Sequence, residues 1–398
     1  MSTTHEMFRQ HWLEVIGTFL KIGALSYGGA ASMGIMQTEV QERRAWLPND
    51  QFIQGLALVN TFPGPHGIQL GIFLGYTRAG WWGGVLAGLC FILPAFCILL
   101  SLTLIYQDYG ALPRIRHLFY GLSPVVVGIF AMSVYRLGRS AVRDAKQVLL
   151  TVAGALAVGL TPLGIVPILL LGGATGVALY GSRAWGTVSG LVIMMLYGAH
   201  YWGSQWLPIH ALTATSMGRT VSSLSPGLWD IGLFFLKVGA FSFGGGLTFL
   251  AFIQDQVVNQ LHWLTPQQFL DGLALGQLTP GPTLMLAAFV GYAVGSTRGA
   301  AVAAAAVYLP SFVLMLSMLP VLERIKRLAW MKAALQGVSP VVIGITAVAV
   351  FRMSPYAIPD LLTGAVAVGT VVAMLLWRLS PLPLMMGGAA LGLVVRAR

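Results

Sequence analysis

The sequence contains very little charge. Only 9% of its 398 residues are Asp, Glu, Lys or Arg, whereas 57% are hydrophobic. A soluble protein carries roughly 25% charged residues, because polar groups must cover its surface. The shortage excludes a soluble enzyme, a nucleic-acid-binding module and a disordered chain, and it places the protein in a lipid bilayer.

Residues and motifs that carry metal, redox or hydrolytic chemistry are also scarce. The two cysteines, Cys90 and Cys97, lie in one apolar run without the spacing of metal ligands. The chain has no phosphate-binding P-loop, no His-Glu-x-x-His motif and no nucleophile elbow with triad partners. We therefore expect no metal, no cofactor and no enzymatic activity. The net charge of +11 comes from basic residues scattered between apolar runs, as in membrane loops, and predicts no nucleic-acid partner.

Long apolar runs make up most of the chain. In a bilayer every backbone polar group must be satisfied internally, so these runs are predicted to be α-helices. At ~20 residues per crossing they predict about 13 transmembrane helices and leave no room for a soluble domain. The runs cover about 13–36, 52–76, 81–106, 117–135, 147–160, 163–180, 186–206, 228–252, 269–293, 299–321, 333–351, 361–377 and 382–395.

The sequence repeats itself once. Residues 19–29 match residues 235–245 at eight of eleven positions, 216 residues later. Further Trp-Leu, Pro-Gly-Pro, Leu-Pro and Gly-x-Ser-Pro-Val-Val pairs follow in the same order at offsets of 216 or 217. Collinear matches of this kind predict an internal duplication. We assign a first repeat to 1–185, a linking span and loop to 186–218 and a second repeat to 219–398.

The number of spans gives the duplication a direction. Six predicted spans per repeat and one between them place equivalent spans seven apart, so they cross the membrane in opposite directions. The predicted fold class is an all-α polytopic membrane protein with two inverted-topology repeats, as in many secondary transporters. The loop charges favour an N-terminus on the inside, although Arg43 and Arg44 argue the other way.

Each repeat carries a Pro-Gly-Pro segment within an apolar run. Proline removes an amide donor and glycine relaxes the backbone, so neither helix can run straight through. The half-helix beyond such a break presents free N–H groups and a positive dipole end, which attract anions. A purely structural kink is the alternative. The two segments are Pro63-Gly64-Pro65 and Pro280-Gly281-Pro282.

Glycine clusters interrupt the first run of each repeat. They predict a second discontinuity at similar depth, and close contact between helices is a compatible alternative. The clusters are Gly28-Gly29 and Gly244-Gly245-Gly246.

Two lysines, Lys21 and Lys237, occupy equivalent positions inside apolar runs. A lysine near a helix centre costs ~2.5–3.5 kcal/mol on insertion scales. Together with the half-helix ends, these lysines would form an electropositive site for a small dianion near the midplane. Snorkelling of the ammonium groups to an interface is the alternative.

Carboxylates and one histidine complete the candidate residues. Glu14 aligns with Asp230 and Glu39 with Asp255, and these four are candidates for proton coupling, with simple solvation at span ends as the alternative. His66 follows the first Pro-Gly-Pro directly. It could titrate or donate to an anion, or it could be a hydrogen-bonded interior group.

The pattern Phe-x-Lys-x-Gly-x-x-Ser-aromatic-Gly-Gly, followed by Trp-Leu and Pro-Gly-Pro and present twice, resembles the chromate ion transporter family in its long-chain form. The resemblance implies a multi-pass carrier in the bacterial inner membrane that exports chromate, is driven by the proton motive force and confers chromate resistance. A sulfate or other oxyanion carrier and an anion channel stay open as alternatives, as does a homodimer. The predicted substrate-binding residues are Lys21, Ser26, Gly28, Gly29, Pro63, Gly64, Pro65, His66, Lys237, Ser242, Gly244, Gly245, Gly246, Pro280, Gly281 and Pro282.

Overall fold

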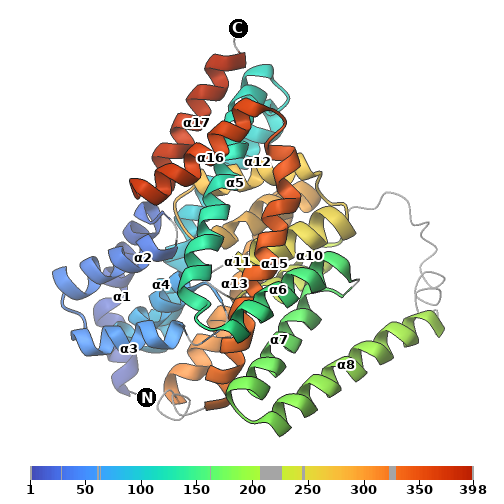
Figure 1. Cartoon of the computed structure of the whole chain (residues 1–398). Helices are drawn as coiled ribbons and strands as arrows, with labels where there is room; N and C mark the ends of the chain where they lie inside the picture. The colour runs from blue at the N-terminus through green and yellow to red at the C-terminus, as the bar shows by residue number, and fades with distance from the viewer. Residues whose placement is uncertain are drawn as a thin grey trace.

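A computed structural model describes residues 2–27, 29–60, 62, 64–161, 163–206, 226–243, 247–321 and 329–396. The described part is helical, as predicted, and Figure 1 shows the two long helices α5 and α15 running through the molecule. The first-repeat elements and the linking helix are α1 (Ser2–Leu25), α2 (Gly29–Met36), η1 (Gln37–Arg43), α3 (Asn49–Val59), α4 (His66–Tyr109), α5 (Pro113–Ala141), α6 (Ala145–Leu160), α7 (Ile165–Tyr180) and α8 (Arg183–Trp206).

The second repeat follows the same order of elements. Four described helices are long and apolar enough to cross a membrane, and four shorter ones are also apolar; each repeat supplies two of each kind. This agreement confirms the all-α, two-repeat fold class. The second-repeat elements are α10 (Leu228–Ala240), α11 (Leu247–Ile253), η3 (Gln254–Gln260), α12 (Pro266–Leu278), η4 (Thr283–Met285), α13 (Leu286–Met318), η5 (Leu319–Val321), α15 (Ala329–Ala357), α16 (Leu361–Leu376) and α17 (Pro381–Arg396).

The two repeats interlock through their long helices. Helices α6 and α7 of the first repeat pack on α15 of the second, while α16 and α17 of the second repeat pack on α5 of the first. Helices α5 and α15 also contact each other, as do α4 and α13. Each repeat therefore covers the central helix of the other.

Small residues allow these helices to approach closely. A Cβ atom on Gly121 of α5 would meet the backbone of Gly388 and Gly392 in α17. At the equivalent contact, a Cβ atom on Gly337 of α15 would meet the backbone of Gly172 and Gly176 in α7. Both helices α7 and α17 thus use a Gly-xxx-Gly pair, which favours close helix association in membranes.

The first predicted span of the first repeat folds back on itself. Lys21 of α1 donates to both carboxylate oxygens of Glu39 in η1 at 3.1 Å, and the ring of Phe19 lies 6.2 Å from that of Trp46. In a straight helix, residues 21 and 39 would lie ~27 Å apart. Helices α1 and α2–η1 are therefore the two arms of a hairpin with its tip near Ser26.

The second predicted span also forms a hairpin, in both repeats. A Cβ atom on Gly55 of α3 would touch the ring of Phe73 in α4, although a straight helix would separate these residues by ~27 Å. In the second repeat, Gly272 of α12 contacts Phe289 of α13 in the same way. The Pro-Gly-Pro segments therefore lie at hairpin tips.

A sharp kink separates each hairpin arm from the long span that follows it. In α4 the backbone leaves helical geometry at Ala79 and Gly80, where Gly80 has φ +69°. In α13 the same break falls at Gly295 and Ser296, where Ser296 has φ +54°. The arm of α4 therefore ends at Arg78, and the chain reverses before crossing the membrane.

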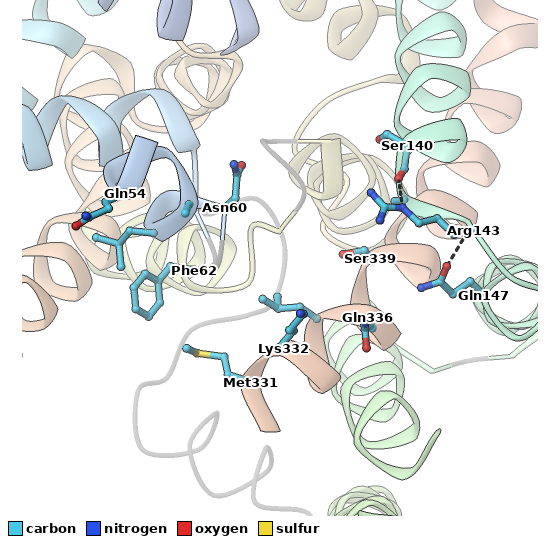
Figure 2. Close-up of a pocket in the computed structure, with 14 residues that line it drawn as sticks. Gln54, Asn60, Phe62, Ser140, Arg143, Gln147, Met331, Lys332, Gln336 and Ser339 are labelled. Atoms are coloured by element: carbon cyan, nitrogen blue, oxygen red, sulfur yellow. Dashed lines mark hydrogen bonds between the residues drawn. The ribbon is translucent and has the colours of Figure 1, made fainter. Parts of the chain in front are cut away.

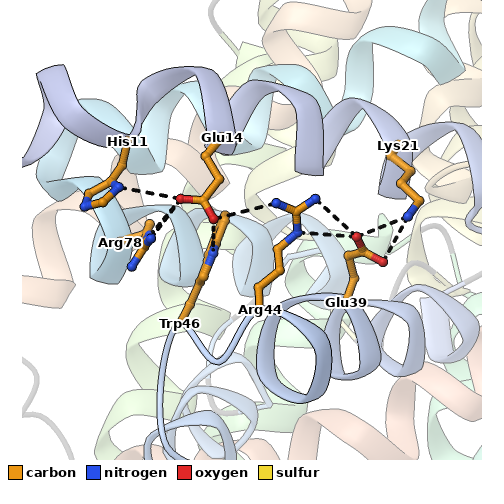
Figure 3. A network of polar contacts seen from close by, with 7 residues as sticks. All are labelled: His11, Glu14, Lys21, Glu39, Arg44, Trp46 and Arg78. Carbon is orange, nitrogen blue, oxygen red and sulfur yellow. Dashed lines mark hydrogen bonds and ion pairs between the residues drawn. The ribbon is translucent and has the colours of Figure 1, made fainter.

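Charged side chains gather at the base of the first-repeat hairpins (Figure 3). Glu14 of α1 accepts hydrogen bonds from the Arg78 guanidinium at 2.8 Å and from the Trp46 indole at 2.7 Å, and Arg44 lies 3.6 Å away. Charges of this kind belong at a membrane surface. The tip at Ser26 lies about 12 residues, or ~18 Å, from Glu14, which is about half of a ~30 Å hydrocarbon core.

The hairpins change the side of the membrane on which the loop charges lie. Because α1 and α2–η1 fold back, Arg43 and Arg44 lie on the same side as the N-terminal part of α1. The positive charges of Arg43 and Arg44 therefore favour an N-terminus on the inside. The first predicted span of the second repeat folds back as well, because the Phe234 ring of α10 lies 6.5 Å from the Phe252 ring of α11. Each repeat thus loses two crossings, and the inverted relationship of the repeats is preserved.

The glycine contacts give a matched test of the packing. Replacing Gly388 by Val places methyl groups against Val125 and the Gly121 carbonyl, and we expect the free energy of unfolding to fall by about 1–3 kcal/mol. At its neighbour Gly387, no described atom lies within 4 Å of the position that a Cβ atom would take, so Gly387→Val should be neutral. Thermal midpoints of the detergent-purified variants measure the difference; equal midpoints would contradict this packing.

Candidate functional site

The four hairpin tips meet crosswise between the repeats. The N–H of Gly64 donates to the carbonyl of Ser242 at 2.5 Å, and the N–H of Gly281 donates to the carbonyl of Ser26 at 2.5 Å. A parallel bridge between Tyr27 and Gly281 extends the second contact. The Pro-Gly-Pro tip of each repeat is thus paired with the serine tip of the other.

Glycine is required at both crossing points. Gly64 has φ +125° and Gly281 has φ +120°, a region that residues with a Cβ atom rarely adopt. A Cβ atom at Gly64 would also meet the amide nitrogen of Gln69 and the hydroxyl of Ser311, while one at Gly281 would meet Ala95. Ser311 and Ala95 occupy equivalent positions in the two repeats, so the first Pro-Gly-Pro tip has polar neighbours where the second has an apolar one.

A cluster of buried hydroxyl groups lies beside the crossing. Ser242, Ser311 and Tyr308 are each 1% exposed, and their hydroxyls have no hydrogen-bond partner in the part of the chain that the structure describes. Tyr308 and Ser311 are one turn apart on α13, and Gln69 is fully buried on α4. Buried hydroxyls are nearly always satisfied in proteins, by protein groups, water or a ligand. This central cluster of Ser242, Tyr308 and Ser311 can therefore donate to a bound molecule.

The N-terminus of α4 points into the same region. The helix begins at His66, directly after the tip, and its N-cap is Pro65, which provides no side-chain cap. The first N–H groups of a helix have no intrahelical partner and carry the positive end of its dipole. They add backbone donors suited to an anion.

A cavity of about 680 Å³, here called vestibule 1, opens beside the first Pro-Gly-Pro tip. Figure 2 shows Gln54, Asn60 and Phe62 on one side of the opening and Arg143 and Gln147 on the other. Its charged lining residues, among those described, are both basic. The lining residues come from α3, α5, α6 and α15 and the Pro-Gly-Pro loop, and they include Gln54, Asn60, Phe62, Ser140, Arg143, Gln147, Lys332, Gln336 and Ser339.

Local hydrogen bonds position Arg143 at the edge of vestibule 1. Its backbone N–H donates to the side-chain oxygen of Gln147 at 2.7 Å, and its Nε donates to the carbonyl of Ser140 at 3.3 Å. Asp144 caps α6 by accepting from the Gln147 N–H at 2.7 Å. This backbone N–H and the Tyr180 hydroxyl hold the pKa of Asp144 below its usual range, so the cap is ionised at neutral pH.

A second cavity of about 590 Å³, vestibule 2, lies at the other end of the same helices. It is lined by the N-terminal part of α5 and the C-terminal part of α15, whereas vestibule 1 is lined by the opposite end of each. About 24 residues of α5 separate Arg116 from Ser140, which corresponds to ~36 Å. The lining residues include Tyr106, Arg116, Tyr120, Ser123, Gln267, Gln268, Asp271 and Tyr356.

The two vestibules are related by the repeat. Lys332 and Arg116 are equivalent, as are Ser339 and Ser123. Because the repeats are inverted, equivalent positions lie toward opposite membrane faces. The cavities thus flank the crossed tips from opposite sides. Their lining differs in charge at two equivalent positions, because Gln54 and Arg143 in vestibule 1 are replaced by Asp271 and Pro359 in vestibule 2.

The two lysines that the sequence singles out lie away from the central cluster. The Lys21 side chain is 48% exposed, pairs with Glu39 and lines a separate cavity of about 430 Å³. Lys237 is also exposed, and its ammonium lies 5.9 Å from the centre of the Phe252 ring. Neither lines a vestibule, and their role in substrate binding stays a prediction.

The predicted proton-coupling carboxylates have local partners. Glu39 accepts from Lys21, Arg43 and Arg44, while Glu14 belongs to the network at the hairpin base.

In the second repeat, Asp230 accepts from the N–H of Gly227 at the start of α10. Asp255 lies 3.7 Å from Arg352 of α15 and accepts from Gln260. The functional role of all four carboxylates stays a prediction.

The remaining predicted substrate-binding residues lie at the crossing, at the ends of neighbouring helices, or outside the described part of the chain. Ser26, Ser242, Gly64 and Gly281 form the crossing, Pro65 and His66 begin α4, and Pro282 precedes η4. Gly29 begins α2, and Pro280 closes the turn after α12. Gly28, Pro63, Gly244, Gly245 and Gly246 lie outside the described residues.

Sequence reasoning missed most of the polar lining. Gln69, Tyr308 and Ser311 are ordinary residues within apolar runs, and nothing in their spacing marks them. The basic pair Lys332 and Arg116 did carry a signal, because the two align at the repeat offset.

Comparison with known proteins agrees with this organisation. The chain matches the family described as Chromate transporter over residues 13–177 and again over 229–393. The second match begins and ends 216 residues after the first, which confirms the repeat offset. No solved structure shows significant similarity to the chain.

Several curated relatives match over most of their length. A chromate transport protein of Cupriavidus metallidurans is 33% identical over 96% of this chain and 92% of the relative. A probable chromate transport protein of Synechococcus elongatus is 32% identical, with 95% and 93% covered. A chromate transport protein of Pseudomonas aeruginosa is 29% identical, with 88% and 84% covered. The chain belongs to the chromate transporter family.

Proposed function

We propose that the protein is a secondary transporter that exports chromate across the bacterial inner membrane, driven by the proton motive force. The observation that carries the proposal is the cluster of buried hydroxyls at the crossed tips. These hydroxyls lack partners among the described residues, and the two vestibules lie at opposite ends of α5 and α15. We take chromate as the substrate because the relatives are named as chromate transport proteins.

Vestibule 1 is the entry in this proposal. With the N-terminus inside, it opens to the cytoplasm. Lys332 and Arg143 make its described lining basic, and a cavity of one charge sign raises the local concentration of oppositely charged solutes. A tetrahedral dianion would therefore collect at the mouth that leads to the first Pro-Gly-Pro tip.

The central cluster is the binding site in this proposal. Hydroxyls of Ser242, Ser311 and Tyr308 and the first N–H groups of α4 can replace part of the hydration shell of an oxyanion. These donors are neutral, so binding is strong enough for entry and weak enough for release. Sulfate has the same charge and shape and would use the same donors, so competition assays distinguish the preferred anion.

The inverted repeats supply the alternation. Carriers of this kind move one repeat against the other around a fixed central site. The crossed tips join the repeats at the site, and the two Pro-Gly-Pro hairpins can tilt at the kinks in α4 and α13. Lys21 and Lys237 lie on hairpin arms and are proposed to add to the positive field around the site.

The central cluster is tested by hydroxyl deletion. Chromate uptake is measured in everted membrane vesicles with an imposed proton gradient. We expect Ser242→Ala and Ser311→Ala each to lower kcat/KM about tenfold, the equivalent of ~1.4 kcal/mol for one hydrogen bond to a charged ligand. Ser101→Ala is the control, because Ser101 is exposed on α4 and bonds the Cys97 carbonyl. Uptake at the wild-type rate by both test variants would contradict the assignment.

Entry through vestibule 1 is tested by charge removal. We expect Lys332→Gln and Arg143→Gln to raise the KM for chromate several-fold, with kcat little changed, because these residues concentrate the anion. The effect should shrink at high ionic strength, where charges on a solvated cavity are screened. Arg139→Gln serves as the control, since Arg139 is exposed near the C-terminal end of α5, four residues before Arg143, and lies outside the cavity lining. An unchanged KM in both variants would place the entry elsewhere.

A further inference from the structure

The described residues include two buried carboxylates, and their surroundings differ. Glu39 and Asp271 are each 6% exposed. Three cations surround Glu39, namely Lys21, Arg43 and Arg44. Asp271 of α12 has no Lys, Arg or His nitrogen within 4.0 Å among the residues that the structure describes.

Neutral groups bind the Asp271 carboxylate instead. The Tyr106 hydroxyl of α4 donates to Oδ2 at 2.7 Å, and the Gln267 amide donates to Oδ1 at 3.0 Å. Burial without a cation opposes the ionised form of a carboxylate, whereas two donated hydrogen bonds favour it. These opposing effects leave both protonation states accessible to Asp271, while the three cations keep Glu39 ionised.

Asp271 faces the path of the anion. It lines vestibule 2, and the equivalent residue in vestibule 1 is Gln54, whose side chain ends in a neutral amide. An ionised carboxylate in this cavity would repel a dianion, and a protonated one would not. Among the described lining residues, the repeat therefore places a carboxylate on one side of the crossing only.

Helix α12 packs against α4, α5, α13, α15, α17, η3 and η4. The acid of η3 is Asp255, which lies 3.7 Å from Arg352. The charged lining residue is Arg116 from α5, and the titratable ones are Tyr106 from α4, Tyr120 from α5 and Tyr356 from α15. Helix α13 contributes the apolar ring of Phe289, 5.8 Å from the ring of Tyr106. Within the described lining, Asp271 is thus the acid of vestibule 2.

We propose that Asp271 is the protonation site that controls anion passage through vestibule 2. The carboxylate takes a proton from water in the vestibule and becomes neutral, which admits the dianion; it returns the proton to water and then excludes the anion. No other bond changes. With the N-terminus inside, vestibule 2 faces the outer, more acidic side, so external acidity opens the exit. The inference rests on the proposed function.

The test compares the pH dependence of transport by the purified full-length protein in liposomes. The pH on the vestibule 2 side is varied from about 5 to about 8, a range that spans the titration of a buried carboxylate. The ratio of the KM for chromate in each variant to that of the wild type is recorded at each pH, because titration of the anion itself is common to all variants.

We expect the KM of the wild type to increase about tenfold more between pH 5 and pH 8 than the KM of Asp271→Asn, because the asparagine is a permanently neutral isostere of the aspartate. Asp108→Asn is the matched control, because Asp108 is exposed on α4 near Tyr106 and should keep the wild-type profile. Tyr106→Phe removes a donor to the ionised form and should move the midpoint to higher pH. This second variant retains the carboxylate and tests the inference even if Asp271→Asn fails to fold.

A wild-type pH profile in Asp271→Asn would overturn the inference. If Asp271→Asn does not fold, an unchanged midpoint in Tyr106→Phe would overturn it. In either case, chromate transport by the wild type would still support the proposed function. Absence of chromate transport by the wild type at every pH would overturn the proposed function and this inference with it.

Discussion

Two backbone hydrogen bonds between the repeats determine the rest of the structure. A hairpin tip at mid-depth exposes N–H and carbonyl groups that lipid cannot satisfy, so it must find partners within the protein. Gly64 pairs with Ser242, and Gly281 pairs with Ser26. Because each pair joins different repeats, neither repeat can bury its own tips alone, and the interlocking of α5 and α15 with helices of the opposite repeat follows from the same requirement.

The scaffold is symmetric, but the side chains at its centre are not. Ser311 stands where the other repeat has Ala95, and Asp271 stands where it has Gln54. At the hairpin base of the first repeat, Glu14 binds Arg78 and Trp46, whereas in the second repeat Trp263 packs on Phe234 at 5.2 Å. Duplication therefore accounts for two vestibules of similar volume and equivalent lining positions, and these side-chain differences distinguish one end of the molecule from the other.

Much of the fold could be predicted from the sequence. The lack of charge, the repeat offset and the Pro-Gly-Pro segments led to an all-α membrane protein with two inverted, broken repeats and to the correct family. Fold-back of the runs 13–36 and 52–76 could not be predicted, because a hairpin within the membrane is as apolar as a full span. The central cluster was also beyond reach, since Ser311 meets the first Pro-Gly-Pro tip only through a contact between segments about 247 residues apart in the sequence. Lys21 was conspicuous because a charge in an apolar run is costly, yet its partner Glu39 becomes a neighbour only when the hairpin closes.

The most direct measurement is the location of the bound anion. Chromium scatters X-rays anomalously, so a crystal of the protein grown with chromate would give a difference peak at the anion itself. We expect a peak between the tips, within hydrogen-bonding reach of the Ser242 and Ser311 hydroxyls and the N-terminus of α4. A peak beside Lys21 in its separate cavity, with none at the crossing, would contradict it.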